Sequence, residues 1–299
     1  MEKFSKVIHS IQKYNLLINV DYKDFLQAQN LDSFASIWDN QDGKTIKDIK
    51  PRKVVRLCVP NSQNGTTLYI KKHKLQFIGL RGLMQKLRGS HWISQGPLEF
   101  KNICAFRENG LHTVIPVAAG ERFYRLFWVQ SLLITQDFSP YNSLELITEH
   151  DPDYFTGSVG KIRKNALLQE IASLAKKMHA RGYHHRDFNA THILLHYDHG
   201  SAKPLLALFD LQRVEKKRSI AARWMIKGLA RLNYSLPDHI FSTQDKLRVF
   251  LSYHEREKLD LVRRILWFWI QRKEARITRH TEKKLMKKNL LSIIFQIIV

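Results

Sequence analysis

The chain has few of the features that mark secreted, membrane-spanning or disulfide-bonded proteins. Among its 299 residues there are two cysteines, Cys58 and Cys104, which argue against a disulfide framework and fit a reducing compartment. The start, MEKFSKVIHSIQKYNLL, lacks the long apolar run of a secretory signal. The apolar end NLLSIIFQIIV is far shorter than the roughly 20 residues needed to span a bilayer. We therefore expect a cytoplasmic protein.

Acidic residues are also scarce. The chain has 27 Asp and Glu against 49 Lys and Arg, a formal net charge of +22. Such a field attracts polyanions, namely nucleic acid, anionic membranes, phosphorylated substrates and nucleotides, and composition alone does not choose among them. Internal repeats, low-complexity tracts and nucleic-acid-binding motifs are missing, so a nucleic-acid partner is disfavoured. The hydrophobic content of 44% predicts a globular protein.

The order of predicted elements favours an α+β fold with two lobes. Two β-rich runs, 54–59 and 66–70, flank Asn64-Gly65 and predict a hairpin. A helix is expected over 97–109, strands over 111–120 and 125–135, and a helix over 161–180, with mostly helices afterwards. We expect a break near 134–143. The predicted organisation is an extension of unclear role (1–49), an N-lobe (50–134), a C-lobe (135–254) and a basic helical segment (255–299).

The most distinctive stretch is YHHRDFNATHILLHYDH, residues 183–199, which lies in a region with six of the chain's 14 histidines. One interpretation is a zinc site, because His192 and His196 are four residues apart. The segment HILLHY favours a strand, however, and no cysteine or following glutamate supports zinc. A second interpretation is the kinase catalytic loop H-R-D-x-x-x-x-N, with His185, Arg186 and Asp187 in the first three positions and His192 in the last.

Each position of that loop answers a chemical need. Asp187 can accept the proton of a hydroxyl that attacks the γ-phosphate, and a neutral His192 imidazole can replace an amide oxygen as a metal ligand. Further elements follow the kinase order. Asp210 ends the apolar strand ALFD and matches the metal-binding Asp, Lys71 ends the strand TLYIK, and Glu99 is a candidate partner for Lys71. Taken singly, Lys71 can be an exposed lysine and Glu99 a charge favoured by a helix N-terminus.

Together these residues resemble the lipopolysaccharide core kinase family, which includes heptose and Kdo kinases of Gram-negative bacteria. The similar segments are YIKKH (69–73), EFKNICAFRENGL (99–111), ITQDFSPYNSLE (134–145), MHARGYHHRDFNATHILL (178–195), LFDLQR (208–213) and AARWMIKGLARLNYS (221–235). Histidine at the last position of the HRD loop is typical of this family.

The resemblance implies a protein-kinase-like fold, ATP, Mg²⁺ and phosphoryl transfer to a sugar hydroxyl of the lipopolysaccharide inner core. It implies that Asp187 is the base, Asp210 and His192 are metal ligands, and Lys71 and Glu99 orient the phosphates. Thr135, Gln136, Asp137 and Phe138 would form the hinge that meets adenine. A G-x-G-x-x-G loop is missing from the sequence, and the nearest candidate is VRLCVPNSQNG (55–65).

The charge has further interpretations. Residues 255–288 carry 12 basic and five acidic residues around LVRRILWFWIQRK, so this segment is either a helix on an anionic membrane surface or part of the core. A kinase-like protein acting on another substrate, a pseudokinase scaffold and a nucleic-acid-binding module remain as alternative functions. A nucleotide-binding assay with and without Mg²⁺ separates the kinase from the last two. The sequence specifies neither the sugar hydroxyl nor the oligomeric state.

Overall fold

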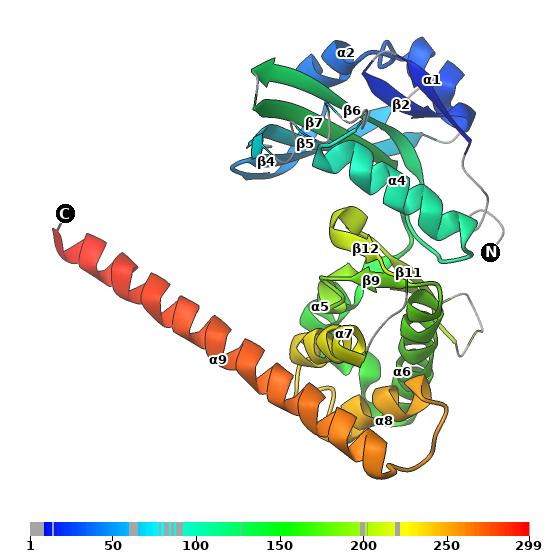
Figure 1. Ribbon diagram of the computed structural model, residues 1–299, viewed down its shortest axis with the longest axis vertical. Helices are drawn as coiled ribbons and strands as arrows, with labels where there is room; N and C mark the ends of the chain where they lie inside the picture. The colour runs from blue at the N-terminus through cyan, green and yellow to red at the C-terminus, as the bar shows by residue number, and fades with distance from the viewer. Residues whose placement is uncertain are drawn as a thin grey trace. The chain divides into compact units, whose positions relative to one another are not determined.

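The computed structural model describes residues 9–298 except 14, 60–64, 78, 81–83, 85–86, 88–91, 126, 198–200, 202 and 219–221 (Figure 1). The side chains of 75, 125 and 288–298 are also outside this description. The chain divides into two compact units. The first comprises Met1–Pro140 with Ala207–Arg213, and the second comprises Tyr141–Leu206 with Val214–Val299.

The first unit is built on an antiparallel sheet. Within its described residues seven strands pair in the order β1-β2-β6-β7-β5-β4-β3. They are β1 (Ser10–Lys13), β2 (Leu16–Asn19), β3 (Lys44–Ile49), β4 (Arg52–Val59), β5 (Thr66–Phe77), β6 (Pro116–Arg125) and β7 (Trp128–Gln136). Strand β4 alternates between buried Val55, Leu57 and Val59 and exposed Arg56 and Cys58. That period of two is why this sequence forms a strand with one buried face.

Helices cover both faces of this sheet (Figure 1). One face carries α1 (Lys23–Ala28) and α2 (Phe34–Asp39), and the other carries α4 (Gln95–Glu108). Helix α4 begins very close to β7, because a side chain at Gly96 would collide with the Leu132 carbonyl oxygen. The Gly96 N–H donates to the Ser131 hydroxyl at 2.8 Å, which fixes this end of the helix. The close approach places Glu99, one turn further on, over the centre of the sheet.

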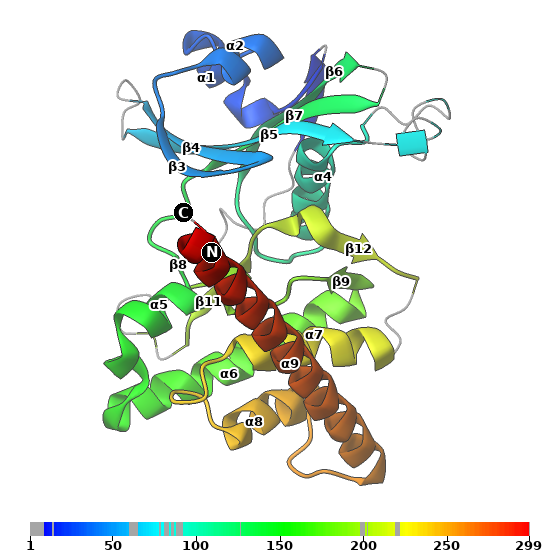
Figure 2. The same cartoon turned by 90° about the vertical axis from the view of Figure 1, so that its left-hand side faces the viewer.

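The second unit is mainly helical. Its helices are α5 (Leu144–His150), α6 (Gly157–Ala180), α7 (Ala222–Ser235), α8 (Thr243–Tyr253) and α9 (Leu261–Ile298). Helix α6 packs on α8, and α9 runs along α7 (Figure 2). Short strands lie beside them: β8 (Asn142–Ser143) pairs with β10 (Ile193–His196), which neighbours β11 (Leu205–Leu208), and β9 (Tyr183–His185) pairs with β12 (Val214–Lys216). Within the part of the chain that is described, none of the helices combines the length and apolar character needed to cross a membrane.

The expected fold class is confirmed, with a β-sheet in the N-terminal part and helices in the C-terminal part. The predicted hairpin is β4–β5, in which Val55 pairs with Ile70, although its predicted turn at Asn64 lies outside the described residues. The strand expected over 111–120 instead begins at Pro116. Thr113 forms an isolated bridge with Leu208, so this stretch pairs with β11 before the sheet begins. Residues 10–49, to which no role was assigned, supply β1–β3, α1 and α2.

Candidate active site

A cluster of charged side chains lies in the first unit, between β5, α4 and the segment after β11. Lys71 extends from β5 toward α4, and its ammonium donates to both carboxylate oxygens of Glu99 at 2.8 Å. The same ammonium donates to Asp210 Oδ1 at 3.0 Å. Lys71, Glu99 and Asp210 were selected from the sequence, and the fold brings all three together. Neighbouring Lys72 extends from the other face of the sheet, where it donates to the Trp38 carbonyl.

Burial gives this cluster its electrostatic character. Glu99 is 2% exposed, and burial raises the pKa of its carboxyl above the ordinary value, while the Lys71 ammonium opposes that change. Arg52 on β4 adds a second cation, whose Nη atoms lie 3.4 Å from Asp210 Oδ2. Burial next to Lys71 and Arg52 lowers the pKa of His73 to about 4, so His73 is neutral at pH 7. Two cations and two carboxylates therefore balance in a poorly solvated site.

Asp210 has a special backbone conformation. Its φ angle is +57°, in the left-handed region that Asp tolerates better than most residues because its short side chain bonds locally. The next residue, Leu211, is fully buried, and its carbonyl accepts a hydrogen bond of 2.8 Å from Asn102 on α4. The turn is thereby tied to the helix that carries Glu99, so the positions of the two carboxylates are coupled.

The HRD loop lies in the second unit, between β9 and β10. The backbone N–H of Asp187 donates to His185 Nδ1 at 3.1 Å. His192 Nδ1 lies 2.8 Å from the Asp187 carbonyl oxygen, with the His185 and His192 rings stacked 5.8 Å apart. Because a carbonyl only accepts, His192 Nδ1 carries a proton that it donates to the Asp187 carbonyl.

Ion pairs hold this loop from two further elements. Arg231 on α7 donates from Nη1 to Asp187 Oδ1 at 3.0 Å. Arg186 pairs with Glu215 on β12, the strand that is paired with β9. Near the other end of the loop, Thr191 donates to Glu145 on α5 at 2.9 Å. The Arg231 contact orients the Asp187 carboxylate, and the other two contacts hold the loop on either side of it.

The expected hinge leaves the sheet at the end of β7. Thr135 pairs with Tyr69 and Pro116 inside the sheet. The backbone N–H of Gln136 donates to Ile115, and that of Asp137 donates to Thr67 at 2.8 Å.

The zinc hypothesis finds no support. Within the described residues there is no group of three or more His, Cys, Asp or Glu side chains able to hold a metal ion. The His196 ring packs 5.6 Å from Tyr141, while His192 stacks on His185. Mg²⁺ makes a different demand, since it is usually bound by one or two carboxylates and by substrate phosphates. Asp210 suits that need by its chemistry, whereas an imidazole nitrogen such as that of His192 is a less common Mg²⁺ ligand than oxygen.

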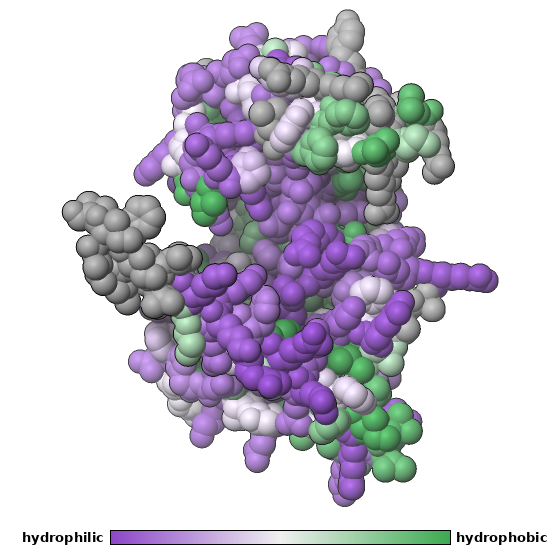
Figure 3. Space-filling view, turned by 60° about the vertical axis from the view of Figure 1, so that its left-hand side comes forward, coloured by the Kyte–Doolittle hydropathy of each residue, from purple (hydrophilic) through white to green (hydrophobic). Residues whose placement is uncertain are grey.

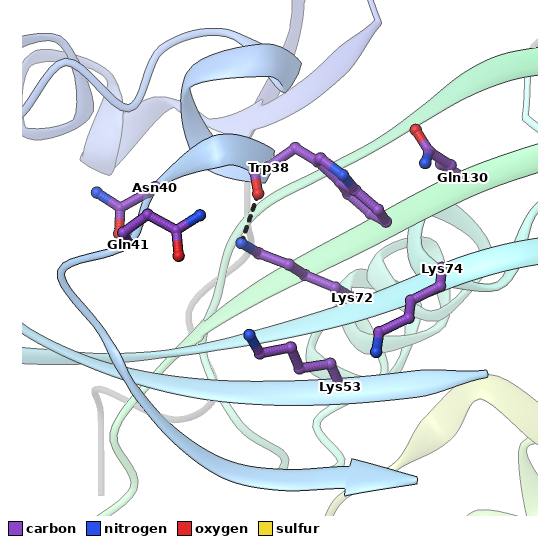
Figure 4. Close-up of a pocket in the computed structure, with 7 residues that line it drawn as sticks. All are labelled: Trp38, Asn40, Gln41, Lys53, Lys72, Lys74 and Gln130. Atoms are coloured by element: carbon purple, nitrogen blue, oxygen red, sulfur yellow. Dashed lines mark hydrogen bonds between the residues drawn. The ribbon is translucent and has the colours of Figure 1, made fainter. Parts of the chain in front are cut away.

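A separate pocket of about 360 Å³ lies in the first unit, on the face of the sheet that carries α2 (Figure 4). Three lysines enter it from neighbouring strands, Lys53 from β4 and Lys72 and Lys74 from β5, and Trp38, Asn40, Gln41 and Gln130 complete its lining. Successive residues of a strand point to opposite faces, so Lys71 is directed away from this pocket. The pocket therefore takes no part in the candidate site.

A buried Lys–Glu pair on a sheet-based unit, a strand-end Asp and an HRD loop define a phosphotransferase of the protein-kinase-like class. The family model described as Lipopolysaccharide kinase (Kdo/WaaP) family matches residues 83–253. The chain belongs to this family.

Individual relatives agree. A protein of Pseudomonas aeruginosa named lipopolysaccharide core heptose(I) kinase WaaP is 26% identical over 268 residues, covering 84% of this chain and 95% of the relative. A protein of the same name from Escherichia coli is 24% identical and covers 85% of this chain and 97% of the relative. A solved structure of WaaP in complex with acyl carrier protein aligns with a TM-score of 0.62 at 25% identity, over 87% of this chain and 98% of the solved chain.

Two cations beside the candidate carboxylates were not selected from the sequence. Arg52 precedes a β-rich run, and Arg231 lies in the segment AARWMIKGLARLNYS, which was recognised as similar to the family without a role for any residue. Their sequence distances from their partners explain the omission. Arg52 is 158 residues from Asp210 and Arg231 is 44 residues from Asp187, and local patterns carry no information at such separations.

Proposed function

We propose that this chain is an ATP-dependent kinase that phosphorylates a sugar hydroxyl of the lipopolysaccharide inner core. Membership of the lipopolysaccharide kinase family supports the kinase activity and the class of acceptor. The observation that carries the residue assignment is the contact of one lysine, Lys71, with both Glu99 and Asp210. That arrangement is the one a kinase uses to orient nucleotide phosphates, and a pseudokinase would have no need to retain it.

The first unit supplies the nucleotide half of the reaction. Lys71 would bind the α- and β-phosphates, because its ammonium is held by Glu99 and is still 14% exposed. Asp210 would hold Mg²⁺, which would neutralise charge on the phosphates. His192, on the HRD loop of the second unit, is kept as a proposed second donor. Thr135–Phe138 would border the adenine.

The second unit supplies the acceptor half. Asp187 would accept the proton of the attacking sugar hydroxyl while that oxygen forms a bond to the γ-phosphorus and the bond to the β-γ bridging oxygen breaks. Arg231 and the N–H contact to His185 hold the Asp187 carboxylate in one orientation. Positioning and charge stabilisation of this kind account for most of the rate in phosphoryl transfer.

The direct test replaces the two aspartates separately. Asp187→Asn keeps the shape but no longer accepts a proton, so we expect at least a 100-fold lower kcat with little change in the KM for ATP. Asp210→Asn weakens metal binding and should lower activity further at limiting Mg²⁺. Transfer of labelled phosphate from ATP to isolated core oligosaccharide is the assay. Wild-type turnover in both variants would refute the assignment.

Heptose is the proposed sugar, because both relatives named above are core heptose(I) kinases. Mass spectrometry of core oligosaccharide from a strain that lacks this protein would reveal the missing phosphate and its position. A phosphate missing from Kdo instead of heptose would correct the choice of sugar. The solved WaaP structure is a complex with acyl carrier protein, so we also propose that this chain binds that carrier. Co-purification of the two proteins would test this association.

We further propose that α9 holds the enzyme at the anionic cytoplasmic face of the inner membrane. Trp267 and Ile270 are buried against the second unit, whereas Phe268 and Trp269 are 53% and 48% exposed. Exposed Ile265 extends the same apolar face. Figure 3 shows apolar side chains gathered near the start of α9 among hydrophilic ones. An exposed aromatic face flanked by Arg and Lys is typical of a helix that lies on a membrane surface.

The burial of Trp267 and Ile270 decides how this proposal is tested. Removing α9 would uncover the faces that these side chains cover, so point variants are preferable. Phe268→Ala with Trp269→Ala should lower sedimentation with vesicles of anionic lipid at 50 mM salt at least fivefold, with the melting temperature preserved. The control is Leu285→Ala, an exposed apolar residue further along the helix. Unchanged vesicle binding of the double variant would contradict the proposal.

A further inference from the structure

A group of cations lies on the surface of the second unit beside Asp187. Arg223, Lys227 and Arg231 are spaced four residues apart on α7 and therefore share one face of that helix. Lys273 and Arg276 extend from α9, which packs along α7 (Figure 2). We call these five residues the cationic strip. Its α7 part is about 12 Å long, since eight residues rise about 1.5 Å each.

The charges of the strip are mostly uncompensated. Among the described residues, no carboxylate forms an ion pair with Lys227, Lys273 or Arg276. Burial, followed by the charges of Arg276, Lys227 and Arg231, lowers the pKa of Lys273. Like charges four residues apart on a helix repel one another and destabilise it. The fold therefore holds cations together at a cost in stability, which a bound anion would remove.

An aromatic ring organises one end of the strip. The Lys227 ammonium lies 4.4 Å and the Arg223 guanidinium 4.9 Å from the centre of the Trp224 ring. Lys217, which follows β12, adds a third cation at 5.0 Å. Cation–π contacts of this kind attract each cation to the face of the ring. They offset part of the repulsion and restrict these long side chains to one region.

The other end of the strip reaches the candidate catalytic base. Arg231 is both the last α7 member of the strip and the residue that contacts Asp187 Oδ1 at 3.0 Å. An anionic molecule bound along the strip would therefore have one end next to Asp187. Arg186, which is also near Asp187, is not part of the strip, because it is already paired with Glu215.

We propose that the cationic strip binds the negatively charged groups of the acceptor, carboxylate or phosphate, and so presents a neighbouring sugar hydroxyl to Asp187. This inference rests on the proposed kinase function and adds the residues that select the acceptor. A strip of several cations over about 12 Å suits an extended acceptor with two or more anionic groups, rather than a single small anion. Lys227 and Lys273 determine the affinity, and Arg231 also positions Asp187.

The test compares the parent chain with the double variant Lys227→Gln, Lys273→Gln. The acceptor is a water-soluble core oligosaccharide freed of its lipid. We expect the KM for this acceptor to rise at least tenfold at 50 mM salt, with kcat at saturation within about threefold of the parent, and the difference should shrink at high salt. The matched control, Lys177→Gln with Lys258→Gln, removes two charges elsewhere in the same unit and should leave both constants unchanged. Circular dichroism confirms that the variants fold.

Chemically altered acceptors identify the recognised group. If the strip binds carboxylates, reducing the acceptor carboxyls to alcohols should abolish the difference between parent and variant. If it binds phosphates, removing the acceptor phosphates should do so. A variant KM equal to that of the parent for the unaltered acceptor would overturn the inference. So would a defect that appears only when the acceptor is embedded in anionic vesicles, because the strip would then bind the membrane.

Calorimetry of oligosaccharide binding, without ATP, tests the cationic strip separately from the kinase function. Binding that is at least tenfold weaker in the double variant, together with no phosphate transfer by the parent, would refute the kinase function and leave the strip as an anion-binding surface. Transfer by the parent with equal binding by both proteins would uphold the kinase and refute the strip. A rise in the KM for ATP alone would assign the strip to the nucleotide and also overturn the inference.

Discussion

His179 is expected to make the second unit sensitive to acid. It lies near the end of α6 and is 5% exposed, with its Nδ1 3.0 Å from the Tyr253 hydroxyl on α8. Its Nε2 is buried without a hydrogen-bond partner, close to Gly228 on α7. Burial, with a smaller effect of His184, lowers the pKa of His179 from 6.5 to about 4. The folded protein therefore keeps this ring neutral.

The size of the effect follows from that pKa. Because the folded state binds the proton less well than the unfolded state, stability is fully present above pH 6.5 and is lost as the pH falls toward 4. The difference between 6.5 and about 4, at about 1.4 kcal/mol for each pKa unit, gives a total of about 3 kcal/mol. About 2 kcal/mol of this should already be lost at pH 5.

The perturbation is His179→Phe, which removes the titrating group and fills a similar space. At pH 7.5 the variant should be less stable by about 1 kcal/mol, because the Tyr253 hydroxyl loses its partner. Between pH 7.5 and 5 the parent should lose about 2 kcal/mol more than the variant. Urea unfolding at each pH measures both quantities, and every other titrating group cancels in the comparison.

Two controls make the interpretation specific. Tyr253→Phe removes the same hydrogen bond but keeps the titration, so its pH dependence should match that of the parent. His239→Gln changes an exposed histidine and should alter neither quantity. Equal losses in the parent and His179→Phe would refute the reasoning.

The remaining predictions concern the candidate site. Glu99→Gln keeps the shape of the side chain but removes its charge, so Lys71 should shift toward Asp210; a KM for ATP raised about tenfold is expected in steady-state assays, and an unchanged value would contradict this role. His192→Asn should retain at least tenfold more kcat than His192→Ala, since an amide oxygen also ligates Mg²⁺; equal losses would mean that His192 acts only through the Asp187 carbonyl. Glu215→Gln should lower kcat severalfold without changing the KM for ATP, because Arg186 loses its partner on β12, and a rise in that KM would argue against this.

The elements that sequence patterns predicted well are those with strong local signals. Two β-rich runs around Asn64-Gly65 predicted β4 and β5, and apolar residues at helical spacing predicted α6 to within a few residues. The order Lys71, Glu99, Asp187, Asp210 was also recognised from local motifs, and the structure brings Lys71 into contact with Glu99 and Asp210. The expectation that Lys71 ends a strand is wrong, because β5 continues to Phe77 and Lys71 lies in its middle.

Residues 10–49 show where local signals fail. Strands β1 and β2 are four residues each, and β3 is exposed along its whole length. Short strands carry too few residues for an alternating pattern to stand out, and an exposed strand has no buried face to mark it. The place of β2 in the sheet is decided by pairing with β6, about 100 residues further along the chain, whereas β3 is held by its hairpin partner β4.

The distribution of charge connects these observations to the proposed function. Cations of the candidate site have carboxylate partners: Lys71 with Glu99 and Asp210, Arg186 with Glu215, and Arg231 with Asp187. The excess of positive charge therefore lies elsewhere, and on the second unit it includes Lys227, Lys273 and Arg276 of the cationic strip. Paired cations give a site its geometry, whereas unpaired ones attract anions over distance. A kinase whose acceptor is an anionic saccharide carried on a membrane needs both, which explains why a net charge of +22 accompanies a site that is itself close to neutral.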